Sequence, residues 1–558
     1  MTNTSFQIGP FTGEEEIETI EKPKRKSLVL KDICPHCNKT FAMVSSFDIT
    51  NKDTGQVTHI LKGLCGHTII KKGAIKANYS AHESIDGRSP YPFQVKGMEF
   101  MEDANFRVLC ADEMGLGKTI QSIIPLKYHK DTLLPAAIFC KAKLTRQMAE
   151  ETARWLGFDY IPQIITSGKD VIYGMPVTIF SLDVLRNFAI EKFEKAEFKT
   201  VIIDECQHIK NPDSQRTMQV RRMCRDIDHV IALSGTPFKN RASEYFTILN
   251  LLRPDKFPSF HTFQYQYLDY YSTNYGSKDR GLRNPKGFER ATKDFIIRRL
   301  REDVMPDLPK VDRKLFYVDL EKKEAKEYER ESVAFNAFYE KACAEGVEDD
   351  AATQVNLLAR IAKLKHICGR SKVTDCFDFA TDFLMTTDKK LAIFVHHQDV
   401  GSELNNRLTR WCNEFHFEPP LILTGGMTAD KCYDVTQEFK KPGVNRILIA
   451  STLASGEGLN LQYQCCDCVI LERQWNPANE EQVEARFTRP DSINMGGYVS
   501  STYMLAGGTI DEWLTQLVEA KRIIFQSVMD GKVADSAGSL QSELIDIVLK
   551  KNRERWAL

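Results

Sequence analysis

The 558-residue sequence lacks an excess of either charge sign and lacks any long hydrophobic run. Lys and Arg number 75 and Asp and Glu 76, so the net charge indicates no polyanionic partner, and a nucleic-acid site would have to be a local basic surface. No apolar stretch approaches the roughly 20 residues that span a bilayer. The start, MTNTSFQIGP, has neither the basic region nor the apolar core of a secretory signal. We expect a soluble intracellular protein with no membrane partner.

Cysteines arranged as a disulfide framework are also missing. The 15 cysteines are an odd number, and most stand singly inside apolar runs, as Cys110, Cys140 and Cys206 do. Such cysteines are typical of reduced thiols in an intracellular compartment.

Two short motifs near the N-terminus depart from this pattern. A C-x2-C pair and a C-x-H pair at this separation are typical of a closed, four-coordinate zinc site. They predict a structural zinc ion in an N-terminal zinc ribbon, with His36 and His59 as competing ligands and unliganded thiols in a small β-ribbon as the alternative. The predicted zinc ligands are Cys34, Cys37, Cys65 and His67.

The periodicity of the chain predicts two α/β lobes. Between about 85 and 250, and again between 386 and 508, runs of β-branched residues such as TVIIDE and RILIAST alternate with amphipathic stretches. Runs of this kind are typical of buried parallel strands in βα units. The remaining segments are a flexible tail (1–27), a zinc-ribbon-like domain (28–80), helical insertions with a linker (251–385) and a C-terminal helical brace (509–558).

The strongest functional signal is ADEMGLGKTIQ at 111–121, between a predicted strand and a predicted helix. Two glycines let successive main-chain N–H groups face phosphate oxygens at the start of a helix. Lys118 can then bind the β- and γ-phosphates of ATP, and Thr119 can bind magnesium. A turn without function is the alternative, and Asp112 departs from the glycine of the general pattern. The predicted nucleotide-binding residues are Asp112, Glu113, Met114, Gly115, Leu116, Gly117, Lys118 and Thr119.

Two further groups of residues suit ATP hydrolysis. Asp204 and Glu205 end the apolar strand TVII, where Asp204 would hold magnesium and Glu205 would activate the attacking water. Gln482, Arg486 and Arg489 share one helical face of QVEARFTR. Arginines of a second lobe that face a bound nucleotide stabilise the phosphoryl transition state. Taken alone, such an acidic pair or arginine pair is usually a solvated surface.

The motifs together resemble those of the Swi/Snf-type ATPases within helicase superfamily two. The set comprises DEMGLGKT, DECQHIKNPDS, LSGTP, TGGM, STLASGEGLNLQ and WNPANEEQVEARFTR, in family order from about Tyr91 to Glu512. The resemblance implies two RecA-like lobes that bind ATP between them and move along duplex DNA. It also implies an adenine contact for Gln94, an arginine finger at Arg489 and a second motif arginine at Arg486.

The sequence departs from the family where DNA and catalysis would be coupled. Gln207 replaces the more usual His of the Asp-Glu-x-His box, and FTRPD replaces HRIGQ. Lysines stand where the first DNA-contacting motif of the family often reads Pro-x-Ser. Because a protein that tracks on a duplex holds mostly phosphates, the predicted DNA contacts are basic or small polar groups. They are Lys141, Lys143 and Arg146 on the first lobe and Gly425, Ser451 and Thr452 on the second.

The sequence therefore predicts a monomeric, DNA-dependent ATPase that translocates on double-stranded DNA with ATP, magnesium and zinc as cofactors. Its partners would be duplex DNA and DNA-bound proteins, in the cytoplasm of a microbe or of a virus-infected cell. A strand-separating DNA or RNA helicase is one alternative. A nucleotide-dependent DNA clamp without turnover is another, against which the intact Lys118, Asp204, Glu205 and Arg489 argue.

Overall fold

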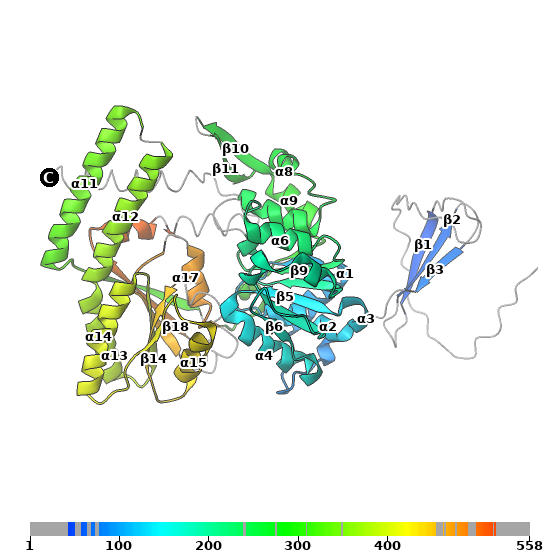
Figure 1. Ribbon diagram of the computed structural model, residues 1–558, viewed down its shortest axis with the longest axis horizontal. Coiled ribbons are helices and arrows are strands. Elements are labelled where there is room, and N and C mark those ends of the chain that lie inside the picture. The colour runs from blue at the N-terminus through cyan, green and yellow to red at the C-terminus, as the bar shows by residue number, and fades with distance from the viewer. Residues whose placement is uncertain are drawn as a thin grey trace, which may run out of the picture. The chain divides into compact units, whose positions relative to one another are not determined.

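The computed structural model divides into two compact units, 1–78 and 79–558 (Figure 1). The first unit is described by its backbone only. In the described helices no segment is both long and apolar enough to cross a membrane. The structure describes residues 43–50, 57–63, 68–72, 77–237, 242–273, 276–308, 310–347, 350–452, 461, 465–474, 477–488, 498–516 and 518–519.

The first unit contains a three-stranded antiparallel sheet of β1 (Met43–Thr50), β2 (Val57–Gly63) and β3 (Thr68–Lys72), with β2 in the centre. The predicted zinc ligands lie outside the described residues. The zinc ribbon therefore stays a prediction.

The first lobe of the second unit is built on a seven-stranded sheet of order β12-β4-β9-β8-β5-β7-β6, in which every pair is parallel. All residues of β5, β7, β8 and β9 are buried, as the continuous apolar runs of the sequence predicted. The strands are β4 (Arg107–Cys110), β5 (Ala136–Cys140), β6 (Gln163–Ile165), β7 (Val177–Ser181), β8 (Thr200–Ile203), β9 (His229–Leu233) and β12 (Ile296–Ile297).

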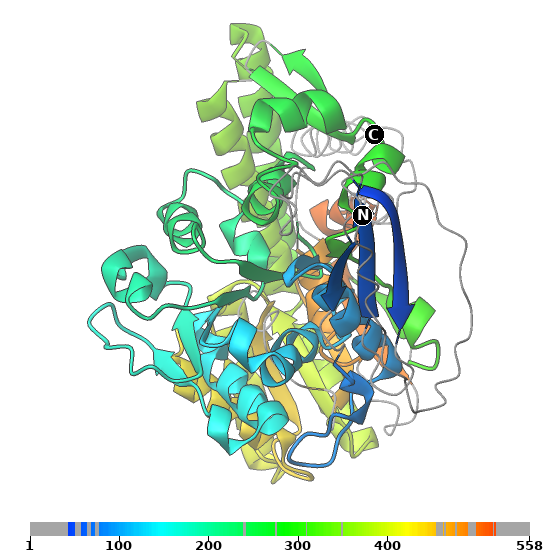
Figure 2. The ribbon, with the colours of Figure 1, turned by 90° about the vertical axis from the view of Figure 1, so that its right-hand side faces the viewer.

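Helices connect these strands and cover the sheet. The helices drawn in cyan, α2 and α4, pack against each other on one side of it (Figure 2). The first-lobe helices are α1 (Pro92–Asp103), α2 (Lys118–Tyr128), α3 (Lys130–Leu133), α4 (Thr145–Leu156), α5 (Ile190–Glu194), α6 (Gln215–Met223) and α7 (Phe246–Leu252).

The second lobe is built on a six-stranded parallel sheet of order β13-β18-β17-β14-β16-β15. An α/β fold with parallel sheets is thus confirmed. The strands are β13 (Val311–Val318), β14 (Lys390–Val395), β15 (Leu421–Leu423), β16 (Ile447–Ser451), β17 (Cys465–Ile470) and β18 (Val499–Ala506). The helices are α13 (Val373–Thr386), α14 (Gln398–Glu414), α15 (Ala429–Lys440) and α17 (Pro477–Glu484).

The segment 251–385 is more than a helical insertion, because β12 adds to the edge of the first sheet and β13 to the edge of the second. Its two longest helices, α11 and α12, pack side by side (Figure 1). The remaining elements are α8 (Phe260–Tyr267), β10 (Leu268–Thr273), β11 (Gly276–Leu282), α9 (Pro285–Thr292), α10 (Arg301–Val304), α11 (Lys322–Glu345) and α12 (Ala351–Ser371).

The sheet order positions the functional loops. Strands β4, β9 and β8 are neighbours, and so are β8, β5 and β7. Since all are parallel, their carboxyl ends meet at one edge, which is where ligands bind in such sheets. The loops that carry Lys118, Asp204 and Lys141 therefore meet at that edge.

Candidate nucleotide and DNA site

The loop between β4 and α2 has the backbone that a phosphate-binding loop requires. Gly115 and Gly117 have φ values of +91° and +70°, in the left-handed region that only glycine adopts readily. A Cβ on Gly117 would lie 2.3 Å from Nε2 of Gln94. Lys118 begins α2, and its Nζ donates to the main-chain oxygens of Asp112 at 3.0 Å and Glu113 at 3.4 Å. Thr119 follows it in the helix.

Asp112, the departure from the general pattern, is fully buried and its carboxylate is bound within the protein. Nε of Arg299 donates to its Oδ1 at 3.0 Å, and Nε2 of Gln121 donates to its Oδ2 at 3.1 Å. Its side chain therefore fixes the loop. This explains why a carboxylate can stand where the general pattern has glycine.

The arginines that follow β12 hold the rest of the loop. Arg298 donates to the main-chain oxygen of Ala111 at 3.0 Å. Arg301 binds the Glu113 carboxylate through Nε and through its own main-chain N–H, each at 2.7 Å. Sequence reasoning missed these arginines as site residues. The available signal was three arginines within four positions directly after an apolar pair, Ile296 and Ile297.

Gln94 lies on α1, directly beside the phosphate loop. Its Oε1 accepts from the main-chain N–H of Tyr91 at 2.9 Å, and its Nε2 donates to the main-chain oxygen of Leu116 at 3.1 Å. The side chain is buried. This placement suits a group beside a nucleotide base, and the adenine contact itself stays a prediction.

The acidic pair stands at the carboxyl end of β8. Burial and the charge of Glu205 raise the pKa of Asp204 from 3.8 to about 7, while Lys118 and Arg486 act in the opposite direction. Glu205 has a φ of +49°, which is uncommon for a residue with a side chain and typical of functional sites. When both carboxylates are ionised, a nearby positive charge is therefore needed to offset their mutual repulsion.

A chain of hydrogen bonds connects Glu205 to the turn after β9. Gln207 Nε2 donates to Glu205 Oε2 at 2.7 Å, and Ser234 Oγ donates to Gln207 Oε1 at 2.6 Å. The Thr236 main-chain N–H donates to Ser234 Oγ at 3.0 Å. The glutamine that replaces the usual His thus provides one donor and one acceptor, and it connects the Glu205 carboxylate to the turn after the neighbouring strand.

The second lobe supplies Gln482 and Arg486. Burial lowers the pKa of Arg486, and the negative charges of Glu205 and Asp204 on the first lobe act in the opposite direction. Gln482 is buried, and its Nε2 has no hydrogen-bond partner among the described residues. Arg489 lies outside the described residues.

These groups fit ATP with magnesium. Left-handed glycines and Lys118 suit phosphate oxygens, Asp204 suits a divalent cation, and the buried amide of Gln482 is a donor that still lacks an acceptor among the residues described. Lys118, Thr119 and Asp204 would hold the nucleotide and its metal. Bound ATP would supply the phosphoanhydride bond.

The predicted DNA contacts lie at the carboxyl edges of both sheets. Lys141 directly follows β5, and Lys143 Nζ donates to the Gly425 main-chain oxygen of the second lobe at 3.4 Å. Arg146 stacks on the Tyr433 ring at 4.2 Å. Ser451 ends β16. The structure thus brings basic groups of the first lobe to the glycine predicted on the second.

Thr452 is the exception. It is fully buried, and its hydroxyl donates to the Val395 main-chain oxygen at 3.2 Å. Its side chain is therefore directed into the second lobe and is not accessible to a DNA phosphate in this structure.

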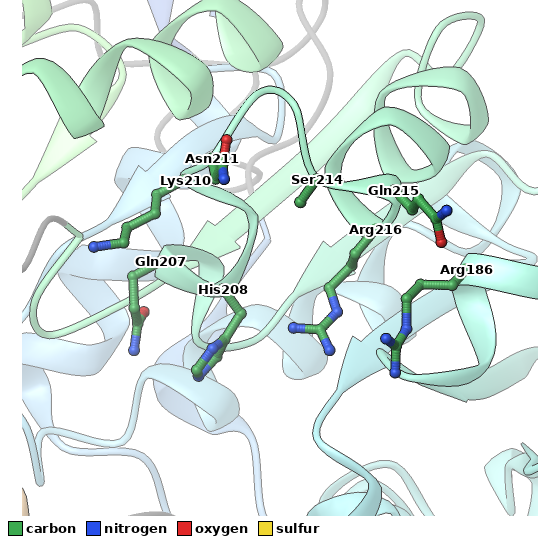
Figure 3. Close-up of a pocket in the computed structure, with 8 residues that line it drawn as sticks. All are labelled: Arg186, Gln207, His208, Lys210, Asn211, Ser214, Gln215 and Arg216. Carbon is green, nitrogen blue, oxygen red and sulfur yellow. The ribbon is translucent and has the colours of Figure 1, made fainter. Parts of the chain in front are cut away.

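A pocket of about 420 Å³ is lined by Gln207, whose side chain donates to Glu205, and by residues of the segments that follow β7 and β8 (Figure 3). Arg186 and Arg216 share one carboxylate, Asp183, at 3.4 and 2.6 Å. Lys210 pairs with Glu244 at 2.6 Å. Sequence reasoning did not single this pocket out. Its lining residues are Arg186, Gln207, His208, Lys210, Asn211, Ser214, Gln215 and Arg216.

Comparison with known proteins decides the family. The SNF2-related domain matches residues 93–373, and the helicase conserved C-terminal domain matches residues 372–491. The chain belongs to the SNF2-related family. The resemblance to Swi/Snf-type ATPases of helicase superfamily two is thereby confirmed.

Several SNF2-related proteins are similar to this chain. The SWI/SNF-related matrix-associated actin-dependent regulator of chromatin subfamily A-like protein 1 of Xenopus laevis is 30% identical over 77% of this chain and 43% of its own length. The DNA annealing helicase and endonuclease ZRANB3 of Bos taurus is 26% identical over 83% and 42%. The chain thus spans less than half the length of these relatives. The Sulfolobus solfataricus SWI2/SNF2 ATPase core in complex with dsDNA has 21% identity and a TM-score of 0.38, over 86% of this chain and 99% of that one.

Replacing Asp204 by asparagine should stabilise the metal-free protein at pH 8. Because its pKa is raised to about 7, the folded state retains a proton that the unfolded state loses near 3.8, and stability is lost progressively as the pH rises from about 3.8 to about 7. Asp204→Asn carries no charge to bury, so its gain at pH 8 should be on the order of a few kcal/mol. Thermal melting in EDTA measures this gain. The gain should shrink as the pH falls below about 7 and disappear near the unfolded-state value of 3.8, and equal melting temperatures at pH 8 would contradict the raised pKa.

Proposed function

We propose that this SNF2-related chain is a DNA-dependent ATPase that translocates on double-stranded DNA, with ATP held between two RecA-like lobes. The observation that supports it best is that the second-lobe segment carrying Arg486 reaches the phosphate loop of the first lobe, where a Cβ on Gly115 would lie 3.3 Å from the Thr488 main-chain oxygen. A nucleotide bound by Lys118 would then meet groups from both lobes. Movement of one lobe against the other would accompany each turnover.

We assign the roles from the positions of the described residues and, for Arg489, from the family resemblance. Lys118 binds phosphate oxygens at the start of α2, and Asp204 holds magnesium. Glu205, which Gln207 orients through a 2.7 Å hydrogen bond, accepts the proton of the attacking water. Arg486 and Arg489 stabilise the negative charge that develops on the transferred phosphoryl group.

Contacts at one edge support a DNA backbone as the activating ligand. Lys141 and Lys143 follow β5, Arg186 follows β7, and His208 and Lys210 follow β8. Since β8, β5 and β7 are adjacent and parallel, these side chains form one basic edge beside the acidic pair. A phosphate in the pocket of Figure 3 would lie next to Gln207 and hence be coupled to Glu205.

Two variants test the nucleotide site. Lys118→Ala removes the charge on the β- and γ-phosphates, and Glu205→Gln removes the base while leaving phosphate binding in place. We expect both to lose turnover by at least about 100-fold. Glu205→Gln should still bind a fluorescent ATP analogue, whereas Lys118→Ala should bind it weakly. Hydrolysis at the wild-type rate by either variant would disprove the assignment.

The activator separates the translocase from the alternatives. We expect duplex DNA to stimulate hydrolysis more than single-stranded DNA or RNA, triplex displacement to be positive and fork unwinding to be weak. Lys141→Ala/Lys143→Ala should abolish the stimulation and keep the basal rate. The DNA affinity of this variant should fall less steeply with salt, by about one unit of slope for each phosphate that the missing lysines no longer bind.

The matched control for these variants is Arg222→Ala/Arg225→Ala. Both arginines are exposed, and neither has a side-chain partner among the described residues. This control should leave stimulation unchanged. Stimulation by RNA or single strands with efficient fork opening would favour the strand-separating helicase. ATP binding without any turnover would favour the clamp.

For the first unit we propose a structural zinc ion bound by Cys34, Cys37, Cys65 and His67. Zinc bound by thiolates contributes directly to the folding of a small domain. We expect about one zinc per chain by elemental analysis, and its loss in Cys34→Ser/Cys37→Ser. Residues 79–558 form their own compact unit, so the basal ATPase rate of this variant should match the wild type. Metal-free protein after mild purification would refute the proposal.

A further inference from the structure

Arg301 is bound to the phosphate loop by three contacts. Its Nε and Nη2 lie 2.7 and 2.6 Å from Oε1 of Glu113, and its main-chain N–H donates to Oε2 of the same carboxylate at 2.7 Å. Arg301 therefore binds the same carboxylate through its side chain and through its main chain. Glu113 stands two residues before Gly115, so Arg301 follows any movement of the loop.

The remaining nitrogen of the same guanidinium contacts the second lobe. Nη1 of Arg301 donates to Oγ1 of Thr488. Thr488 is buried, and a Cβ on Gly115 would lie 3.3 Å from its main-chain oxygen. Thr488 thus meets the phosphate loop at two points, one through Arg301 and one through its backbone.

Thr488 ends a segment that is fixed at its other end to the second sheet. The Glu484 carboxylate accepts from Arg313 of β13 at 2.6 Å and from the Tyr503 hydroxyl of β18 at 2.8 Å. The Thr488 main-chain N–H donates to the Glu484 main-chain oxygen at 3.3 Å. Arg486 lies between these two anchors.

We propose that Arg301 is a positioning residue that sets the segment carrying Arg486 in register with the phosphate loop. The inference rests on the proposed function, because it matters only if ATP is hydrolysed between the lobes. One planar guanidinium serves two partners here: Nε and Nη2 hold a carboxylate while Nη1 reaches a hydroxyl on the other lobe. A lysine, with a single point charge, cannot reproduce this arrangement.

In a simpler role, Arg301 would hold only Glu113. A substitution at Thr488 distinguishes that role from the positioning role. Thr488→Val removes the hydroxyl, and with it the bond from Arg301 and a 3.4 Å bond to the Glu484 main-chain oxygen, but it keeps the shape and the bonds between Arg301 and Glu113. If Arg301 positions Arg486, this variant should lower kcat for DNA-stimulated hydrolysis about 10-fold, with the KM for ATP changed less than about twofold. Thr488→Ser, which retains the hydroxyl, should restore kcat to the wild-type value.

A double-mutant cycle between Arg301 and Thr488 provides a second test of the positioning role. Arg301→Ala should lower kcat by a similar factor and also raise the KM for ATP, because Glu113 loses its partner. Arg301→Ala/Thr488→Val should be no slower than Arg301→Ala, since the bond between Arg301 and Thr488 is already broken in Arg301→Ala. Wild-type kcat in Thr488→Val, or effects that multiply in the double variant, would overturn the proposal. Arg222→Ala serves as the control for removal of an exposed arginine.

Amide hydrogen exchange tests the same positioning role without measuring ATP hydrolysis. A non-hydrolysable ATP analogue should protect residues 481–488 in the wild type and in Thr488→Ser, and less so in Thr488→Val and Arg301→Ala. Equal protection in all four proteins would also overturn the proposal. If the wild type shows this pattern but no nucleic acid stimulates hydrolysis, the proposed function fails and the positioning role stands.

Discussion

The acidic pair at the end of β8 is the constraint on which the rest of the site depends. Burial and the adjacent charge of Glu205 disfavour the ionised form of Asp204 and raise its pKa to about 7. Positive charge must therefore be supplied, and it comes from Lys118 on the first lobe and Arg486 on the second. Because these cations belong to different lobes, the charge balance of one buried site depends on the position of both.

The order of the strands also connects the acidic pair to the turn after β9. β9 lies between β4 and β8, so the turn after β9 is next to both the phosphate loop and the acidic pair. Ser234 in that turn and Gln207 beyond the pair form a hydrogen-bonded chain to Glu205. Gln207 also lines the pocket that contains Arg186, Lys210 and Arg216.

Local sequence patterns were enough to predict the parts of the site that are local in the chain. The parallel strands, the glycines at 115 and 117 and the acidic pair each follow from a short pattern with one physical reason. Partners distant in sequence could not be found this way: Asp112 and Arg299 are joined only by folding. The same holds for the inward hydroxyl of Thr452, since no pattern of small polar residues shows whether a strand end faces solvent. β12 and β13 were missed because they add to sheet edges within a charged segment.

The edge strands also show where the two lobes are joined. β12 belongs to the first sheet and β13 to the second, so residues 298–310 are a covalent connection between the lobes. Arg298, Arg299 and Arg301 in this connection bind Ala111, Asp112 and Glu113 of the phosphate loop. The link is therefore attached to the loop that would bind nucleotide.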